Sequence, residues 1–331
     1  MFRSVRLSLV VLVSALGVRP GFPATPLPFP QTGGSTVVAA DGSGEFKSIQ
    51  EAINAAPQLT DPKDPWTIHI RPGFYREQIY IMREKRFIHL VGDNPTTTII
   101  SEDSYAGMIG HDGQQIGTFR TPTVWIDADD FSVSGLTIAN SAGAVGQAVA
   151  LRVDGDRVSF DRCRFTGWQD TILVNRGRQY FRDCTITGAV DFIFGGATAY
   201  FDHCQIDVVG DGYVTAASTL PSDKWGLVFS HCTIKGTKPG IQTFLGRPWR
   251  AFASVTVVAT EMDATVKPAG WDNWDRPDRE KTCRYAEYGN TGPGAGPGGR
   301  VSWATRLTPE QAAAISPGSV LAGNDGWQPV Q

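Results

Sequence analysis

A pattern that recurs after 21 residues constrains the fold of this chain more than any other feature. The first copy reads FDRCRFTGWQD (160–170) and the second reads FRDCTITGAVD (181–191). Their Phe, Cys, Gly and Asp positions coincide, and further Phe-x-x-Cys units begin at Phe201 and Phe229. A short β-rich repeat of this length is typical of a solenoid, in which each repeat forms one coil stacked on the last. The chain is therefore expected to be all-β and coiled.

The repeat predicts that Asp170 and Asp191 lie side by side. Residues at the same position of successive coils are one inter-strand spacing apart, about 4.8 Å. Two carboxylates at that distance do not both ionise easily, so one pKa should rise. An acid beside a nucleophile or base is a catalytic arrangement. The alternative is an inert ladder of aspartates at the turns of the solenoid.

Four of the five cysteines share one repeat position: Cys163, Cys184, Cys204 and Cys232. They are expected either to form a ladder of buried thiols or to include a disulfide, with Cys184–Cys204 as the first pair to test. His203 and His231 each precede a ladder cysteine. Neighbouring residues on a strand point to opposite faces, so these histidines are expected at the surface rather than in a metal site with the cysteines.

The first 24 residues resemble a secretory signal peptide. Arg3 and Arg6 precede an apolar run (7–18), and Ala24 offers a small residue for cleavage. The apolar run is too short to span a membrane. The mature chain is therefore expected to be secreted, either to the periplasm or to the extracellular space.

The rest of the chain is interpreted as one domain. Residues 25–35 are a flexible lead-in, and residues 36–331 form a single β-helix catalytic domain. An α-helix is expected at 45–56, where Phe46, Ile49, Ile53 and Ala56 fall on one face, and it would cap the N-terminal end of the solenoid. A short helix is also expected at 307–315.

Charge and motif content exclude two classes of function. The formal net charge is −3, and no basic patch suited to nucleic acid is present. The sequence contains no G-x-S-x-G motif, which argues against a serine esterase of the α/β-hydrolase type.

Five motifs in order carry a resemblance to a known family: GFYRE (73–77), GQAVAL (146–151), QDT (169–171), DFIFG (191–195) and LGRPW (245–249). The chain resembles the pectin methylesterases, carbohydrate esterases that remove methyl groups from polygalacturonate. The resemblance implies a right-handed parallel β-helix, which agrees with the repeat. It also implies that pectin (methylated homogalacturonan) is the substrate, and that no metal or organic cofactor is required.

The same resemblance implies roles for individual residues. Asp191 would be the nucleophile, and Asp170 would be the general acid and then the base. Gln147 and Gln169 would donate hydrogen bonds to the oxyanion. Arg247 would hold the nucleophile, because its planar fork suits a carboxylate.

Substrate-binding residues are expected around this set. They are Gln147, Arg247, Trp249, Thr118, Phe192, Tyr213 and Trp271, with Phe244 as a further candidate. Trp249 and Trp271 are expected to stack on sugar rings, although either could instead be a core residue.

Other activities stay open at this stage. A non-catalytic β-helix could bind glycans, although the intact set of two Asp, two Gln and Arg argues against loss of activity, and an esterase of the same family could act on another ester. A β-helical pectate lyase would need a calcium site of clustered carboxylates, and a polygalacturonase would need two carboxyls flanking a glycosidic oxygen. The set of Gln147, Gln169 and Arg247 favours acyl transfer. The enzyme is expected to be a monomer that binds neither nucleic acid nor, after signal removal, membrane.

Overall fold

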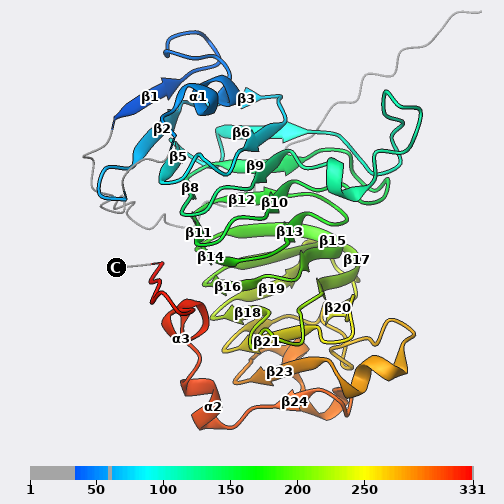
Figure 1. Ribbon diagram of the computed structural model, residues 1–331. Coiled ribbons are helices and arrows are strands. Elements are labelled where there is room, and N and C mark those ends of the chain that lie inside the picture. The colour runs from blue at the N-terminus through cyan, green and yellow to red at the C-terminus, as the bar shows by residue number, and fades with distance from the viewer. Residues whose placement is uncertain (1–33, 59–61, 330–331) are drawn as a thin grey trace, which may run out of the picture.

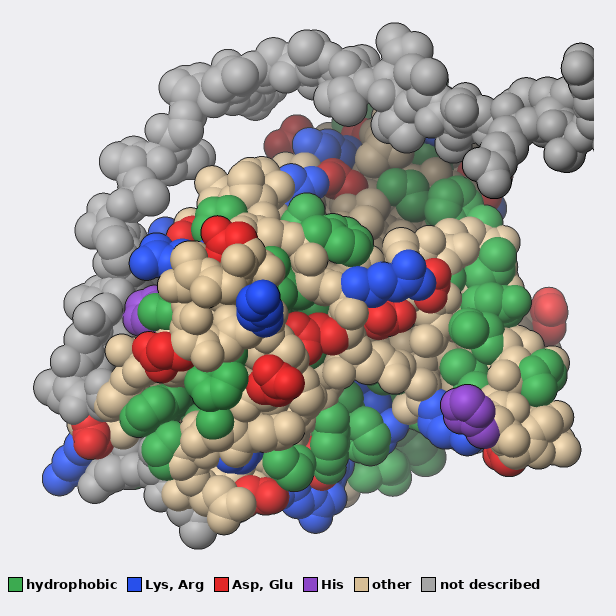
Figure 2. Space-filling model, turned by 90° about the horizontal axis from the view of Figure 1, so that it is seen from above, with side chains coloured by type: hydrophobic (Ala, Val, Ile, Leu, Met, Phe, Trp, Pro, Cys, Tyr) green, Lys and Arg blue, Asp and Glu red, His purple; other side chains and the backbone are tan. Residues whose placement is uncertain are grey.

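The computed structural model describes residues 34–58 and 62–329, most of which coil into a stack of parallel strands (Figure 1). The expected signal peptide (1–24) and most of the expected lead-in (25–35) lie outside the described residues. No helix in the described part is long and apolar enough to cross a membrane. Seen from the N-terminal end, acidic and basic side chains are interspersed over the visible surface (Figure 2).

The strands of the coils stack into three columns. The first column is one parallel sheet whose strands follow chain order. They are β1 (Ser35–Val38), β2 (Trp66–Ile70), β5 (Ile88–Gly92), β8 (Ser132–Ser134), β11 (Val158–Asp161), β14 (Arg178–Arg182), β16 (Thr198–Asp202), β18 (Leu227–Ser230), β21 (Ser254–Val258), β23 (Arg284–Tyr288) and β24 (Thr305–Arg306).

The second and third columns join into one sheet, because two long strands bend through both. The second column holds β3 (Gly73–Tyr75), β6 (Thr98–Glu102), β9 (Thr137–Asn140), β12 (Arg164–Thr166), the first halves of β15 (Thr185–Gly195) and β17 (Gln205–Ala217), β19 (Thr233–Gly236) and β22 (Glu261–Met262). The third holds β4 (Ile79–Ile81), β7 (Val124–Ile126), β10 (Leu151–Val153), β13 (Ile172–Val174), the second halves of β15 and β17, and β20 (Thr243–Gly246).

The sequence repeat sets the register of the coils. Phe160 pairs with Phe181, Phe181 with Phe201, and Phe201 with Phe229. Their rings stack in the core with centroids 4.5, 4.6 and 4.6 Å apart. The predicted all-β, parallel β-helical fold is therefore confirmed.

The repeated glycine has a packing reason. A Cβ added at Gly188 would lie 2.3 Å from the Cβ of Phe192, and one at Gly167 would lie 2.6 Å from Oγ1 of Thr171. In both copies the chain bends here from the second column to the third, which brings the residue four positions later against the glycine backbone. Any larger side chain would push that residue out of place.

The ladder cysteines are free, buried thiols. Each lies against a backbone carbonyl of the preceding coil: Cys184 Sγ to the Phe160 oxygen at 3.7 Å, and Cys204 Sγ to the Phe181 oxygen at 3.5 Å. Burial raises the pKa of both thiols. Of the two alternatives, the structure has the thiol ladder and not a Cys184–Cys204 disulfide.

Helix α1 (Ile49–Ala55) is shorter than the predicted 45–56, because Phe46 is drawn into a bridge with Val38 and Ser48 becomes the N-cap. Glu77, from the GFYRE motif, receives hydrogen bonds from the Ser48 hydroxyl and the Ile49 backbone N–H at 2.6 and 2.8 Å. The helix lies at the N-terminal end of the stack (Figure 1) and buries apolar side chains in the main core. Its role as a cap stays a prediction.

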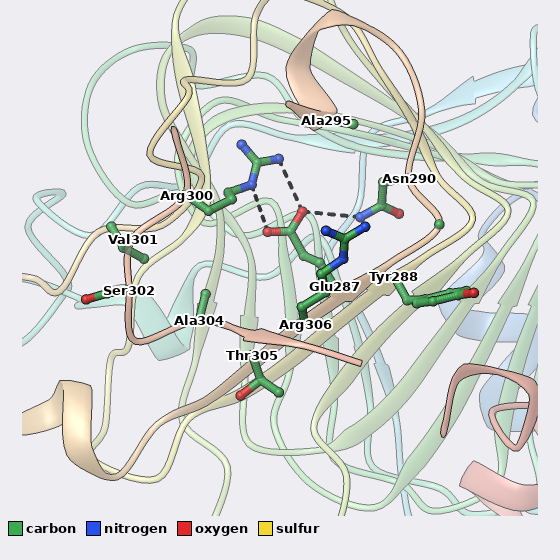
Figure 3. Close-up of a pocket in the computed structure, with 11 residues that line it drawn as sticks. Glu287, Tyr288, Asn290, Ala295, Arg300, Val301, Ser302, Ala304, Thr305 and Arg306 are labelled. Atoms are coloured by element: carbon green, nitrogen blue, oxygen red, sulfur yellow. Dashed lines mark hydrogen bonds and ion pairs between the residues drawn. The ribbon is translucent and has the colours of Figure 1, made fainter. Parts of the chain in front are cut away.

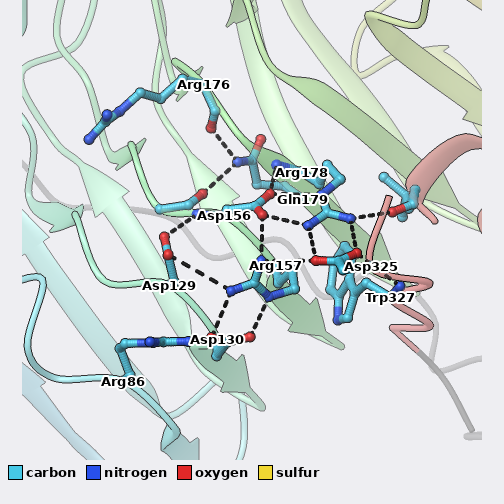
Figure 4. Close-up of polar contacts among 12 residues, drawn as sticks. Arg86, Asp129, Asp130, Asp156, Arg157, Arg176, Arg178, Gln179, Asp325 and Trp327 are labelled. Atoms are coloured by element: carbon cyan, nitrogen blue, oxygen red, sulfur yellow. Dashed lines mark hydrogen bonds and ion pairs between the residues drawn. The ribbon is translucent and has the colours of Figure 1, made fainter. Parts of the chain in front are cut away.

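The C-terminal segment returns along the first column of strands (Figure 1). It contains α2 (Pro309–Ala313), within the predicted 307–315, and α3 (Pro317–Leu321). Arg178 fixes it through both terminal nitrogens, which lie 2.6 and 2.7 Å from the Asp325 carboxylate, while Asp156 receives a further hydrogen bond at 2.5 Å (Figure 4).

The far end of the stack carries short 3₁₀ helices and a cavity of about 350 Å³ that is lined by residues of β23, of β24 and of the connection between these strands (Figure 3). There Arg300 pairs with Glu287 at 2.9 Å, and Glu287 also accepts a hydrogen bond from the Trp271 indole at 2.9 Å. The 3₁₀ helices of this end are η2 (Pro277–Lys281), η3 (Pro293–Ala295) and η4 (Pro297–Gly299), whereas η1 (Thr118–Arg120) lies in the connection between β6 and β7.

Candidate active site

A cavity of about 260 Å³ opens over the third column of strands, and successive coils contribute its polar residues. Backbone bridges join Gln147 to Gln169 and Gln169 to Val190, so these residues occupy one level of three neighbouring coils. The cavity is lined by Thr118, Phe119, Gln147, Gln169, Asp170, Asp191, Phe194, Ala216, Arg247, Trp249 and Trp274.

Asp170 and Asp191 occupy equivalent places on neighbouring coils, as the repeat predicts. Ile172 pairs with Ile193 in the parallel sheet. The Asp170 N–H, two residues before Ile172, donates a hydrogen bond to the Val190 oxygen at 3.1 Å, which extends the same register to the aspartates. Both aspartates have left-handed backbones, with φ of 65° and 50°. Asp tolerates this region better than most residues, and the turn directs both carboxyls to the cavity. They are 8% and 5% exposed.

The two carboxyls differ in their electrostatic surroundings. Burial raises the pKa of Asp170 to about 8, and the charge of Asp191 adds to the rise while Arg247 opposes it. Burial also raises the pKa of Asp191, but hydrogen bonds and charge from Arg247 work against that. The arrangement therefore favours a proton on Asp170 and a charge on Asp191 at neutral pH.

Arg247 follows β20 and is held on three sides. Its Nε and Nη2 lie 2.9 and 2.7 Å from the two oxygens of Asp191. Its guanidinium carbon lies 3.8 Å from the centroid of Tyr213 on one face and 3.7 Å from a ring of Trp274 on the other. Two aromatic faces thus sandwich the cation and limit its rotation and its contact with water.

Gln147 and Gln169 present amide groups to the same cavity. Within the described residues, no hydrogen bond holds either side-chain amide. Both can therefore donate to an oxygen that acquires negative charge beside Asp191.

Aromatic side chains form the wall of the cavity. Phe194 and Trp249 lie in contact, with centroids 5.9 Å apart, and belong with Trp274 to a small apolar cluster separate from the main core. Phe119 adds an exposed ring from the 101–121 loop. Such faces suit the apolar sides of pyranose rings.

Comparison with known proteins identifies the family. A model of the pectinesterase family matches residues 35–324. Pectinesterase 31 of Arabidopsis thaliana is 38% identical over 281 residues, which cover 83% of this chain and 88% of that protein. The chain belongs to the pectinesterase family.

Solved structures agree with this assignment. Pectin methylesterase from carrot has a TM-score of 0.82 and 35% identity, with 92% of this chain and 96% of that chain covered. A pectin methylesterase solved in complex with a hexasaccharide has a TM-score of 0.77 and 31% identity, with 89% and 98% covered. The predicted family and enzyme class, carboxylic ester hydrolase, are confirmed.

Some relatives are longer than this pectinesterase. The putative pectinesterase/pectinesterase inhibitor 38 of Arabidopsis thaliana is 39% identical over 279 residues, which cover 81% of this chain but 57% of that protein. The chain thus spans little more than half of such relatives.

Two of the predicted substrate-binding residues are wrong for this pectinesterase. Phe192 is fully buried and Trp271 is 1% exposed, so neither can contact a sugar in the cavity. The strand is irregular near the left-handed Asp191: Phe192 and Ile193 both face the main core, which breaks the alternation and leaves Phe194 on the cavity side. Trp271 instead packs against Tyr285, with centroids 4.5 Å apart.

The other predicted residues lie in or beside the cavity. Thr118, Trp249, Gln147 and Arg247 line it, whereas Tyr213 lies behind Arg247 and stacks on Phe244 with centroids 5.5 Å apart. The lining residues that sequence reasoning missed are Phe119, Phe194, Ala216 and Trp274. Phe194 lies in the same DFIFG motif, but strand alternation alone would place it on the same face as Phe192, so the sequence did not distinguish the two.

Proposed function

We propose that this protein hydrolyses the C6 methyl esters of polygalacturonate, releasing methanol and leaving a free carboxylate. The observation that carries the proposal is the pair of buried aspartates: Arg247 holds Asp191 through two hydrogen bonds, and burial, together with the charge of Asp191, raises the pKa of Asp170 to about 8. Family membership supplies the class of reaction. The hexasaccharide bound by a relative supports a sugar polymer in the cavity.

In the first half of the reaction, a carboxylate oxygen of Asp191 attacks the ester carbonyl carbon. The amides of Gln147 and Gln169 donate hydrogen bonds to the oxyanion that forms. The bond to the methoxy oxygen then breaks, and that oxygen takes the proton of Asp170 and leaves as methanol. The product is an anhydride between Asp191 and the galacturonate.

In the second half, Asp170 is ionised and acts as a base. It takes a proton from water, whose oxygen attacks the galacturonyl carbonyl of the anhydride. The bond to Asp191 breaks and restores its carboxylate, and Asp170 is protonated again. Ester and water thus become acid and methanol, through acid–base and nucleophilic steps that need no metal or organic cofactor.

The remaining cavity residues position the polymer. Trp249, Phe194 and Phe119 offer aromatic faces to the sugar rings, and Thr118 offers a hydroxyl. Arg247 acts on the nucleophile, with Tyr213 and Trp274 on its two faces. Arg247 therefore acts by orienting Asp191 and keeping it ionised, and not by binding sugar alone.

The setting of the reaction is part of the proposal. Pectin is a cell-wall polymer, and the signal-like residues 1–24 are consistent with export of the enzyme to meet it. We infer a secreted enzyme, extracellular or periplasmic, that works as a monomer without nucleic acid or membrane.

The test is methanol release from methylated pectin by the wild type and by Asp191→Ala. The variant should fold and lose activity by about a thousandfold or more, as expected for removal of a covalent nucleophile. Asp183→Ala is the matched control, because Asp183 also has a left-handed backbone (φ 51°) but lies outside the cavity. Substantial methanol release by Asp191→Ala would overturn the nucleophile assignment.

The same assay separates the alternatives. Methanol without chain cleavage identifies an esterase. Unsaturated ends would indicate a lyase, and new reducing ends without methanol a polygalacturonase. Activity on a different ester with none on methylated pectin would contradict the proposed substrate while keeping the mechanism.

A further inference from the structure

Two histidines on adjacent coils stand at the same corner of the β-helix, between the first and second columns. His203 follows β16 and His231 follows β18, and these strands pair in register. Both histidines are exposed and have left-handed backbones, with φ of 52° and 54°. Each is followed by a buried ladder cysteine, so the imidazoles point away from the core. They stack with ring centroids 5.0 Å apart and 7° between the ring planes.

Each ring is oriented by the residue that precedes it. Nδ1 of His203 lies 2.8 Å from a carboxylate oxygen of Asp202, whose other oxygen accepts a hydrogen bond from the Tyr180 hydroxyl at 2.7 Å. Nδ1 of His231 lies 2.9 Å from the Ser230 hydroxyl. With Nδ1 engaged in both rings, Nε2 is the nitrogen of each that can bind a further partner.

We propose that His203 and His231 form a binding site for a divalent cation of the zinc class, with Asp202 as the acidic group behind them. Ligand atoms of all three residues lie within 4.8 Å of one another. Neutral imidazole is a preferred ligand of Zn²⁺ and related metals. Metal-binding histidines commonly use their second nitrogen on a carboxylate, which fixes the ring, and Asp202 holds His203 in this way.

Binding requires a small movement of the rings. Zn–N bonds are about 2.0–2.1 Å, so two nitrogens on one tetrahedral ion are roughly 3.4 Å apart. The stacked rings must therefore tilt toward each other, which exposed side chains can do without disturbing the core. Water would fill the remaining positions. The site is distinct from the catalytic cavity, whose lining includes none of the three residues.

An ion at this site would join two neighbouring coils. One is the coil of β16, which leads into β17, where Tyr213 lies against Arg247. The other is the coil of β18, which a long connection joins to β17. A metal that binds the folded but not the unfolded chain raises stability with its concentration. The site thus predicts both direct binding and a rise in melting temperature.

Isothermal titration calorimetry of ZnCl₂ into the chelator-treated protein tests the site. The wild type should bind one equivalent, and His203→Asn and His231→Asn should each weaken binding by about tenfold or more. Asn suits the left-handed backbone, so these variants keep the corner intact. The matched control is His111→Asn, an exposed histidine outside the cluster, which should bind like the wild type. Asp202→Asn should weaken binding less than loss of either histidine.

Two results would overturn the proposal. One is no saturable Zn²⁺ binding by the wild type, and the other is equal binding by the wild type and the His203→Asn/His231→Asn double variant. Ca²⁺, which prefers oxygen ligands, should not bind here. As a second readout, Zn²⁺ should raise the melting temperature of the wild type and of His111→Asn, but not that of the double variant. Methanol release should be the same in all these proteins, so failure of this site leaves the proposed esterase activity untouched.

Discussion

Arg247 holds Asp191 through two parallel hydrogen bonds, Nε to Oδ1 at 2.9 Å and Nη2 to Oδ2 at 2.7 Å. A single cation therefore touches both oxygens of one carboxyl of the pair, whereas no cationic side chain among the described residues pairs with Asp170 in this way. This asymmetry distinguishes two aspartates that the repeat makes equivalent. It gives the two carboxyls different protonation states and different roles.

The first prediction concerns the fork geometry. In Arg247→Lys the charge remains but the paired hydrogen bonds and the stacking are lost, because an ammonium is a point charge. We expect kcat for methanol release to fall about a hundredfold, with a smaller change in KM. Arg276→Lys, an exposed arginine paired with Asp278, is the control and should keep wild-type activity. Wild-type kcat in Arg247→Lys would show that charge alone suffices.

A second prediction concerns the aromatic sandwich. Trp274→Ala exposes one face of the Arg247 guanidinium to water, which weakens its hold on Asp191. We expect kcat to fall about tenfold, and Trp274→Phe to restore most of it. The acid limb of the kcat/KM profile should move to higher pH, because a less well held Asp191 is harder to ionise. A change in KM alone would assign Trp274 to substrate contact instead.

The sequence predicts those features of the fold and of the site that depend on the 21-residue repeat. The phenylalanine ladder and the neighbouring aspartates follow from one period, since a solenoid carries a local register from coil to coil. The packing of Tyr213 and Trp274 on the two faces of the Arg247 guanidinium could not be predicted from the repeat. Trp274 lies in a loop outside the repeat, and left-handed backbones at Trp274 and Asp275 (φ 61° and 51°) set its direction. Trp271, three residues earlier in the same segment, goes into the core, and residue type alone does not distinguish the two.

A third prediction concerns stability and pH. Asp170 has a pKa of about 8 in the folded protein and about 3.9 in an unfolded chain. Between these values the folded state binds more protons than the unfolded state, so the free energy of unfolding falls as pH rises. This contribution is fully present below about pH 4 and is lost as pH rises through 8. Its slope is at most about 1.4 kcal/mol per pH unit.

Asp170→Asn removes the titrating group and keeps the shape of the side chain. Urea denaturation between pH 5 and 8 should show a flatter dependence of stability on pH in this variant than in the wild type. Asp64→Asn, at an exposed position, should follow the wild type. Identical slopes in Asp170→Asn and the wild type would mean that Asp170 is ionised in the folded protein at neutral pH.

The last prediction compares two tryptophans that the sequence assigned to the same task. Trp249 is partly exposed and lines the cavity, so Trp249→Ala should raise KM for methylated pectin about tenfold through lost stacking and change stability little. Trp271 is buried and donates its indole N–H to Glu287 at 2.9 Å. Trp271→Ala should therefore lower the free energy of unfolding by about 3–5 kcal/mol. The KM of the Trp271→Ala protein that remains folded should change little. Kinetics and urea denaturation of both variants check this division. If Trp271→Ala instead had wild-type stability and a raised KM, Trp271 would be a sugar-binding residue after all, and the loop 271–275 would have to open in solution.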